Sequence, residues 1–147
     1  MKEYEYSFKV TDLKEYINYC KNNNYELISD SDETRDLYSN NSSKIARITI
    51  SDEIVLDFKE TGDTSIILKD REESKPIVIN DLDCTLSILD VLGYKQIKHL
   101  ERHRIVYKKD NVKFELDSYT VPDKEYIVGI EGLKEEVDKV YEEVELS

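Results

Sequence analysis

The sequence is poor in several residue types that common functional motifs require, and each shortage removes a class of protein. It holds only two cysteines, four glycines and two histidines in 147 residues. We expect Cys20 and Cys84, both at apolar helical positions, to be core residues in a reducing compartment. His99 and His103 have no partner at zinc-ligand spacing. No glycine-rich phosphate loop and no G-x-S-x-G pattern is present, which excludes P-loop and hydrolase-triad chemistry.

Basic residues are also scarce relative to acidic ones. The chain has 21 Lys and Arg against 33 Asp and Glu, and a formal net charge of −12. Nucleic acids and anionic membranes require a basic face, so we expect neither as a partner, whereas a local basic pocket for a small anion is still allowed. The chain opens on an alternating strand rather than a cleavable leader, and no run approaches the roughly 20 apolar residues of a membrane span. We therefore expect a soluble, cytoplasmic protein.

Hydrophobic periodicity predicts three helices and eight strands. The helices cover 11–24, 80–94 and 132–146, with Thr11 and either Asn80 or Asp81 as N-caps and Gly93 as a C-terminal stop. The strands cover roughly 3–10, 34–39, 44–50, 53–60, 64–72, 98–108, 111–118 and 124–131. This order predicts a mostly antiparallel α+β fold, and the lack of repeats or linkers predicts a single domain over residues 1–147.

Charged residues alternate with apolar residues on most of these strands. In NVKFELD, residues 111–117, the apolar side chains point to one face, and Lys113, Glu115 and Asp117 point to the other. Such a polar face fits a two-layer sheet with one solvated side. It also fits a closed barrel with a charged interior, which removes exposed sheet edges. Periodicity alone does not choose between these two folds.

A series of short patterns follows along the chain. They are Glu3-Tyr4-Glu5, Asp36-Leu37-Tyr38, Arg47 in ARIT, Lys59 in LDFK, Arg71 to Glu73, Leu92-Gly93, Arg102 and Arg104 before Tyr107, Leu116-Asp117, and Glu131-Gly132. In this order and spacing, the patterns resemble those of the CYTH family, also called triphosphate tunnel metalloenzymes, over nearly the full chain. The resemblance implies an eight-stranded antiparallel, closed or nearly closed β-barrel with about three flanking helices.

The resemblance also implies a charged interior that binds a triphosphate. Guanidinium and ammonium groups bind phosphate oxygens through charge-assisted hydrogen bonds. Carboxylates hold a divalent metal, here Mg²⁺ or Mn²⁺, which takes oxygen ligands. Phosphoryl transfer depends mainly on positioning and charge neutralisation, and a charged tunnel supplies both.

Carried over position by position, the resemblance assigns roles to individual residues. The metal ligands are Glu3, Glu5 and Glu131, with Asp117 as a further acidic contact. The phosphate clamp is Arg47, Lys59, Arg71, Arg102 and Arg104. Tyr38 would orient or activate the attacking water. Lys9 lies one pleat beyond Ser7 on the same face, and its ammonium would reach back to replace the family's first-strand lysine.

The sequence departs from the family pattern at several of these strands. Ser7 stands in place of a lysine, Thr49 in place of an arginine and Gly129 in place of a glutamate, and Lys75 and Ser118 stand where acidic residues are usual. The missing lysine removes a group expected to take part in water activation, and the missing glutamate should weaken the metal site. Our leading prediction is a metal-dependent phosphohydrolase acting on inorganic triphosphate or a small organic triphosphate. The alternatives are a class IV type adenylate cyclase that makes cyclic AMP from ATP, and a non-catalytic polyphosphate or nucleotide binder. Self-association into a homodimer is compatible with all three.

Overall fold

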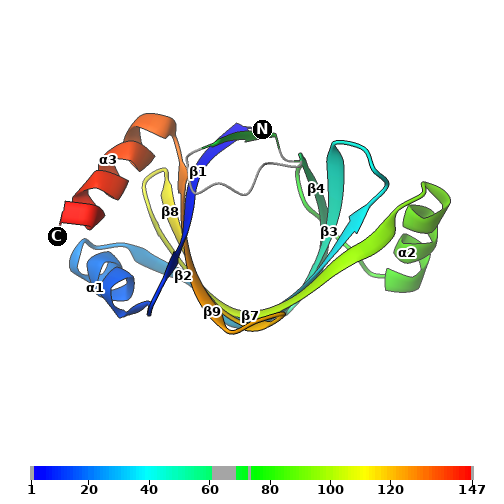
Figure 1. Cartoon of the computed structure of the whole chain (residues 1–147), viewed down its shortest axis with the longest axis horizontal. Coiled ribbons are helices and arrows are strands. Elements are labelled where there is room, and N and C mark those ends of the chain that lie inside the picture. Colours follow the sequence, from blue (N-terminus) through cyan, green and yellow to red (C-terminus); the bar gives the residue numbers. More distant parts are fainter. Residues whose placement is uncertain (1, 61–68, 73, 147) are drawn as a thin grey trace.

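The computed structural model describes residues 2–60, 69–72 and 74–146, and the side chains of 4–60 and 74–145. The helices are α1 (Lys14–Asn22), α2 (Leu82–Val91) and α3 (Lys134–Leu146). The strands are β1 (Lys2–Val10), β2 (Glu26–Ser39), β3 (Lys44–Ile50), β4 (Ile54–Glu60), β5 (Lys69–Glu72), β6 (Ile77–Val78), β7 (Lys95–Lys109), β8 (Val112–Val121) and β9 (Glu125–Gly132). The strands curve around a central axis, with α1 and α3 outside one wall and α2 outside the opposite wall (Figure 1). This is the predicted antiparallel α+β fold.

The strands form one antiparallel sheet in the order β5-β1-β9-β8-β7-β2-β3-β4-β6. The long strands β2 and β7 pair along almost their full length and form the floor of the curl, between a β1–β8–β9 wall and a β3–β4 wall (Figure 1). Among the described residues, no strand pairing joins the two ends of this order, so the sheet is curled but its ladder is not closed. The chain between the end strands crosses this seam. There the Ser74 amide donates to the Phe58 carbonyl, and the Phe58 amide donates to Ser74 Oγ, each at 2.9 Å.

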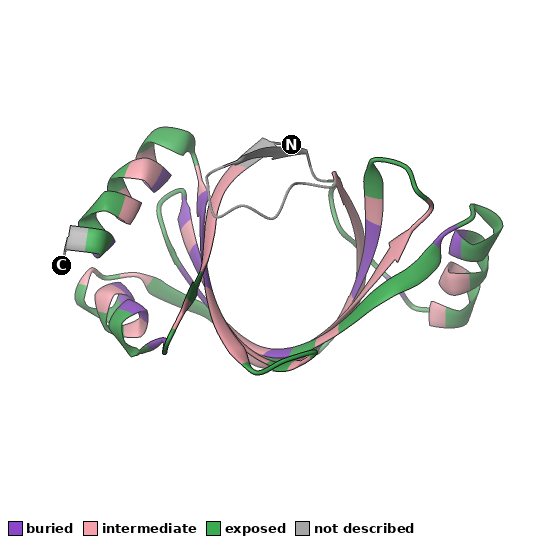
Figure 2. Cartoon of the chain, in the orientation of Figure 1, coloured by how far each residue is buried: buried purple, intermediate pink, exposed green. Residues whose placement is uncertain are grey.

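The apolar faces of the strands point outward and are covered by the helices. One buried cluster joins α1 and α3 to the sheet and includes Cys20, Phe114, Ile130 and Val137. A second lies under α2 and consists of Ala46, Ile48, Leu89 and Tyr94. Figure 2 shows buried residues where the helices meet the sheet. Because full burial of a large aliphatic side chain contributes roughly 1.5–3 kcal/mol, these clusters stabilise the curl from outside and leave the concave face to polar residues.

Several local predictions are confirmed and others are wrong. Asp81 caps α2, where its side chain accepts a hydrogen bond from the Cys84 amide at 3.0 Å, and Gly93 adopts a φ of 83° at the end of that helix. Thr11 is not the cap of α1, whose N-cap is Leu13 without a side-chain hydrogen bond. Cys20 is buried as expected, but Cys84 is exposed because it lies on the outer side of α2.

Strand boundaries differ most at β2. This strand begins at Glu26, well before the predicted start at residue 34, and it pairs with β7 as far as Lys108. Residues 29–33 of this strand, SDSDE, are polar on both faces and therefore lack the alternation that predicts a strand. The two-residue strand β6 was also not predicted. Of the predicted strand 64–72, residues 64–68 lie outside the described part of the chain.

No helix in the described ranges combines the length and apolar character needed to cross a lipid bilayer.

Candidate functional site

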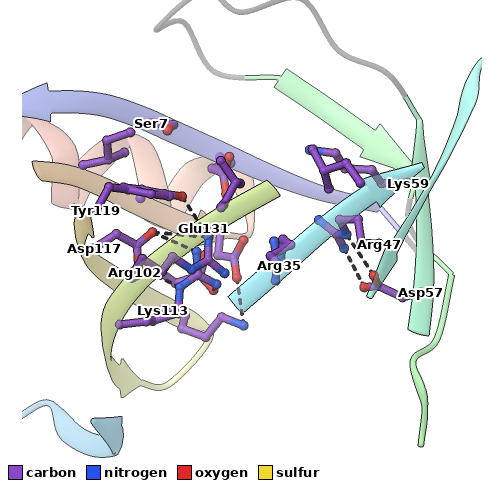
Figure 3. Close-up of a pocket in the computed structure, with 17 residues that line it drawn as sticks. Ser7, Arg35, Arg47, Asp57, Lys59, Arg102, Lys113, Asp117, Tyr119 and Glu131 are labelled. Carbon is purple, nitrogen blue, oxygen red and sulfur yellow. Dashed lines mark hydrogen bonds and ion pairs between the residues drawn. The ribbon is translucent and has the colours of Figure 1, made fainter. Parts of the chain in front are cut away.

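A charged cavity of about 390 Å³ lies on the concave side of the sheet (Figure 3). Its cationic lining residues are Arg35, Arg47, Lys59, Arg102, Arg104 and Lys113, and its acidic lining residues are Glu5, Asp57, Glu115, Asp117 and Glu131. They come from alternate positions of strands that turn their apolar sides to the helices. Lys113, Glu115 and Asp117 therefore face the interior, as the barrel alternative predicts, while Phe114 and Leu116 are fully buried on the outer side.

Arg104 is held in a fixed orientation by two carboxylates on the neighbouring strand. Its Nε and Nη2 atoms donate to the two oxygens of Asp117 at 2.7 and 2.8 Å, and its Nη1 atom donates to Glu115 Oε2 at 2.8 Å. Burial opposes the charge of Arg104, but Glu115 and Asp117 outweigh it and raise the pKa of Arg104 well above its ordinary value. Burial would likewise raise the pKa of Glu115, but Arg104 and then Lys113 outweigh it and lower that pKa. This group of ion pairs stays charged at neutral pH.

Arg102, the next inward residue on β7, is also buried and paired. Its Nε and Nη2 atoms donate to Glu33 Oε1 at 3.1 and 2.9 Å, and its Nη1 atom donates to the Tyr119 hydroxyl at 2.8 Å. Asp117 Oδ2 lies 3.8 Å from the same Nη1 atom. Neighbours from β2 and β8 thus fix the guanidinium plane.

The β3–β4 wall presents a third fixed arginine. Arg47 on β3 lies directly across from Asp57 on β4, and its Nε and Nη2 atoms donate to the two Asp57 oxygens at 2.8 and 2.5 Å. Lys59 lines the same wall, two residues further along β4. Figure 3 shows Arg47 and Lys59 on the side of the cavity away from Asp117 and Tyr119.

Three carboxylates from the β1–β8–β9 wall converge. Glu5 on β1, Glu115 on β8 and Glu131 on β9 each place an oxygen so that all three lie within 4.8 Å of one another. Burial and then the Glu115 charge raise the pKa of Glu131, although Lys113 Nζ lies 2.8 Å from its Oε1 atom. Oxygen donors at this spacing suit a hard divalent cation, which would relieve their mutual repulsion. The residues present therefore fit a divalent cation.

The structure brings most of the predicted site residues together. Those that line the cavity are Glu5, Arg47, Lys59, Arg102, Arg104, Asp117 and Glu131. Glu3 and Arg71 are directly paired across β1 and β5, but their side chains lie outside the described residues.

Two predicted catalytic residues lie elsewhere. Tyr38 is on the outer face of β2 and packs against the cluster under α2, because its neighbour Leu37 takes the inward position. Lys9 follows Glu5 and Ser7 along β1, but its ammonium pairs with Glu125 at 3.0 Å, and its side chain is 75% exposed. Neither side chain lines the cavity, so we assign neither a role in activating water.

Four charged residues of the cavity had no predicted site role, namely Arg35, Asp57, Lys113 and Glu115. Strand alternation indicates that Asp57, Lys113 and Glu115 share a face with predicted site residues. Arg35 lies on the face of β2 opposite to Asp36 and Tyr38, so the Asp36-Leu37-Tyr38 pattern does not predict it. Arg35 Nε donates to Thr49 Oγ1 at 3.0 Å. Desolvation and then the charges of Arg102, Arg104 and Arg47 lower the pKa of Arg35 to about 9.

Comparisons with known proteins identify the fold. No protein-family model matches the sequence, and no curated protein matches it significantly. The PH1012 protein from Pyrococcus horikoshii superposes with a TM-score of 0.75 at 19% identity, over 97% of this chain and 87% of that chain. A candidate adenylate cyclase from Vibrio parahaemolyticus gives 0.69 at 15% identity, over 97% and 83%. A candidate adenylyl cyclase from Hippeastrum, described as having a dominant triphosphatase activity, gives 0.69 at 13% identity, over 96% and 84%. The chain therefore has the fold of the CYTH, or triphosphate tunnel, proteins, as its sequence motifs predict.

Proposed function

We propose that this protein binds a triphosphate in its cavity and hydrolyses it with the help of a divalent metal ion. The observation that carries the proposal is the pairing of two features in one cavity. Arginines and lysines line the floor and both walls, and three converging carboxylates lie on one wall. A polyphosphate anion needs the first feature, and its metal ion needs the second.

The cations are pre-organised for binding. Arg47 and Arg104 each form a bidentate ion pair with an aspartate. Arg102 donates hydrogen bonds to Glu33 and Tyr119. Such orientation reduces the reorganisation needed when phosphate oxygens arrive. The low polarity of a buried site strengthens each charge-assisted bond.

The carboxylates supply the metal site. Glu5, Glu115 and Glu131 would hold Mg²⁺ or Mn²⁺. When bound, such an ion polarises phosphate oxygens and neutralises negative charge. Glu115 stands directly across from Gly129 in the β8–β9 pair, so it offers a carboxylate close to the position where the family pattern expects a glutamate.

The Hippeastrum structure supports hydrolysis over cyclisation, because that protein shares this fold and is described as having a dominant triphosphatase activity. The non-catalytic alternative is favoured by a different observation. Ser7 lines the cavity at the position where the family pattern has its lysine, while the Lys9 ammonium pairs with Glu125. The β1–β8–β9 wall therefore offers a serine where the family pattern has a lysine.

One panel of assays separates the three functions. The purified protein is incubated with tripolyphosphate, thiamine triphosphate or ATP, with and without Mg²⁺ or Mn²⁺, and phosphate, pyrophosphate and cyclic AMP are measured. We expect metal-dependent phosphate release that is lost in Glu5→Gln and retained in the surface control Asp90→Asn. Cyclic AMP with pyrophosphate would identify a cyclase, and binding without turnover would identify a binder. Absence of both binding and turnover for all three compounds would overturn the proposal.

A further inference from the structure

Among the side chains that the structure describes, Arg35 differs from the other arginines of the cavity in having no carboxylate partner. Arg47, Arg102 and Arg104 each form an ion pair with an aspartate or glutamate. The hydrogen bond of Arg35 is to the neutral hydroxyl of Thr49, which lies directly across from it on β3. Within the described side chains, the structure shows no ion pair for Arg35. It is a cation held in place but not neutralised.

The surroundings of Arg35 make this charge costly. Removal from water disfavours the cation, and Arg102, Arg104 and Arg47 add repulsion that Glu115 offsets only in part. With a pKa lowered to about 9, the guanidinium remains charged at neutral pH. A partly desolvated charge without a partner destabilises the protein that carries it. An anion in the cavity would remove this cost.

The position of Arg35 indicates which part of a ligand it contacts. It lies on β2, in the floor between the two walls, and Figure 3 places it between Arg47 and Arg102. Arg47 and Lys59 belong to one wall, and Arg102 and Arg104 lie toward the other. An anion that touches both walls must pass over Arg35, whereas an anion the size of orthophosphate need not.

We propose that Arg35 is a phosphate-binding residue that contacts the middle of a polyphosphate chain and makes the cavity select a chain over a single phosphate. This inference rests on the proposed function, because it takes the ligand to be a triphosphate. The guanidinium would donate hydrogen bonds from its two Nη groups to non-bridging oxygens while Nε stays on Thr49. The other cations would then bind the outer phosphates from either side.

Calorimetric titration with tripolyphosphate and with orthophosphate, both without metal, tests the inference. Because a hydrogen bond to a charged group is lost, we expect Arg35→Gln to weaken tripolyphosphate binding about 10- to 100-fold. Orthophosphate binding should change much less. Arg35→Lys keeps the charge but loses the planar guanidinium with its paired N–H donors. Its tripolyphosphate affinity should therefore fall between those of Arg35→Gln and the wild type. The matched control is Lys95→Gln, which removes an exposed cation paired with Asp90 and should bind like the wild type.

Thermal unfolding without ligand separates ligand binding from a structural role. If Arg35 is an uncompensated cation, Arg35→Gln should unfold at the same temperature as the wild type or higher. A lower unfolding temperature with unchanged affinity would mean that Arg35 only links β2 to β3, which overturns the inference. Equal tripolyphosphate affinity of the wild type and Arg35→Gln would overturn it as well. If the wild type itself binds no tripolyphosphate, the proposed function fails first, and the two failures are distinguishable.

Discussion

At the scale of single residues, three arginines of the cavity, Arg47, Arg102 and Arg104, each form an ion pair with a carboxylate. Asp57 stands behind Arg47, while Asp117 and Glu115 stand beside Arg104. These three arginines are thereby stabilised in the absence of ligand. The same arrangement makes each partner dependent on the other, since a buried charge that loses its counter-ion costs far more than an exposed one.

Arg104→Gln should therefore be strongly destabilising. The substitution leaves Asp117, whose side chain is 5% exposed, and Glu115 without their main cation. We expect the free energy of unfolding to fall by about 3–5 kcal/mol, as measured by urea denaturation. The control Lys95→Gln removes an exposed pair with Asp90 and should change it little. A loss as small as that of the control would mean that the buried carboxylates find other partners.

Glu131 should make the metal-free protein less stable as the pH rises. Burial and the Glu115 charge raise the pKa of Glu131 above its ordinary value of 4.5, so the folded state holds this proton more tightly than the unfolded state. Stability linked to this group is therefore present at low pH and is lost as the pH rises above about 4.5. Glu131→Gln should reduce this loss and also reduce stabilisation by Mn²⁺. Thermal unfolding between pH 5 and pH 9, with and without Mn²⁺, measures both effects, and parallel curves for the two proteins would contradict the assignment.

At the scale of the elements, amphipathic segments could be predicted from the sequence and polar segments could not. The three helices and the faces of β8 follow from apolar spacing, because the residues that make the pattern are those that pack. The first half of β2 has charges on both faces, and its pairing is supported by β7, a partner distant in sequence. The pairing of β2 with β7 and β3 decides which face of β2 turns inward, and this pairing places Arg35 in the cavity.

Two histidines on β7 stabilise this polar pairing from the outer face. His99 Nδ1 lies 2.6 Å from Asp36 Oδ1 and its Nε2 lies 2.9 Å from Glu101, while His103 bridges Asp32 and Asp30. The contact with Asp36 raises the pKa of His99, and the contact with Asp32 raises that of His103. Each imidazolium therefore stabilises the pairing below about pH 6.5, and this contribution disappears as the pH rises through the higher folded-state pKa.

The double variant His99→Gln and His103→Gln should show the loss of these contacts. We expect it to be less stable than the wild type at pH 6 and nearly equal to it at pH 9, because both imidazoles of the wild type are then neutral. Thermal unfolding measures the stability, and proton NMR titration of the wild-type imidazole signals measures the pKa values directly. Imidazole pKa values at or below the ordinary value would contradict the predicted effect.

At the scale of the whole molecule, the hydrophobic core lies outside the curl and the charged cavity lies inside it. The two clusters under α1, α3 and α2 stabilise separate parts of the sheet (Figure 2). The walls are joined through the floor of β2 and β7 and, at the seam, through the chain that crosses between β5 and β6. The spacing of the two walls at the seam is therefore set by few contacts.

Ser74→Pro should weaken the seam and with it the cavity. Proline removes both hydrogen bonds to Phe58, because it lacks the amide hydrogen and the hydroxyl. We expect the free energy of unfolding to fall by roughly 1–3 kcal/mol, as measured by urea denaturation. We also expect weaker tripolyphosphate binding by calorimetry, because the β3–β4 wall would be free to move away from the β1–β9 wall. Ser74→Ala is the matched control, since it keeps the backbone hydrogen bond and should lose less of both. If Ser74→Pro lost stability but kept full affinity, the floor strands alone would set the spacing of the two walls, and the seam would have no part in binding.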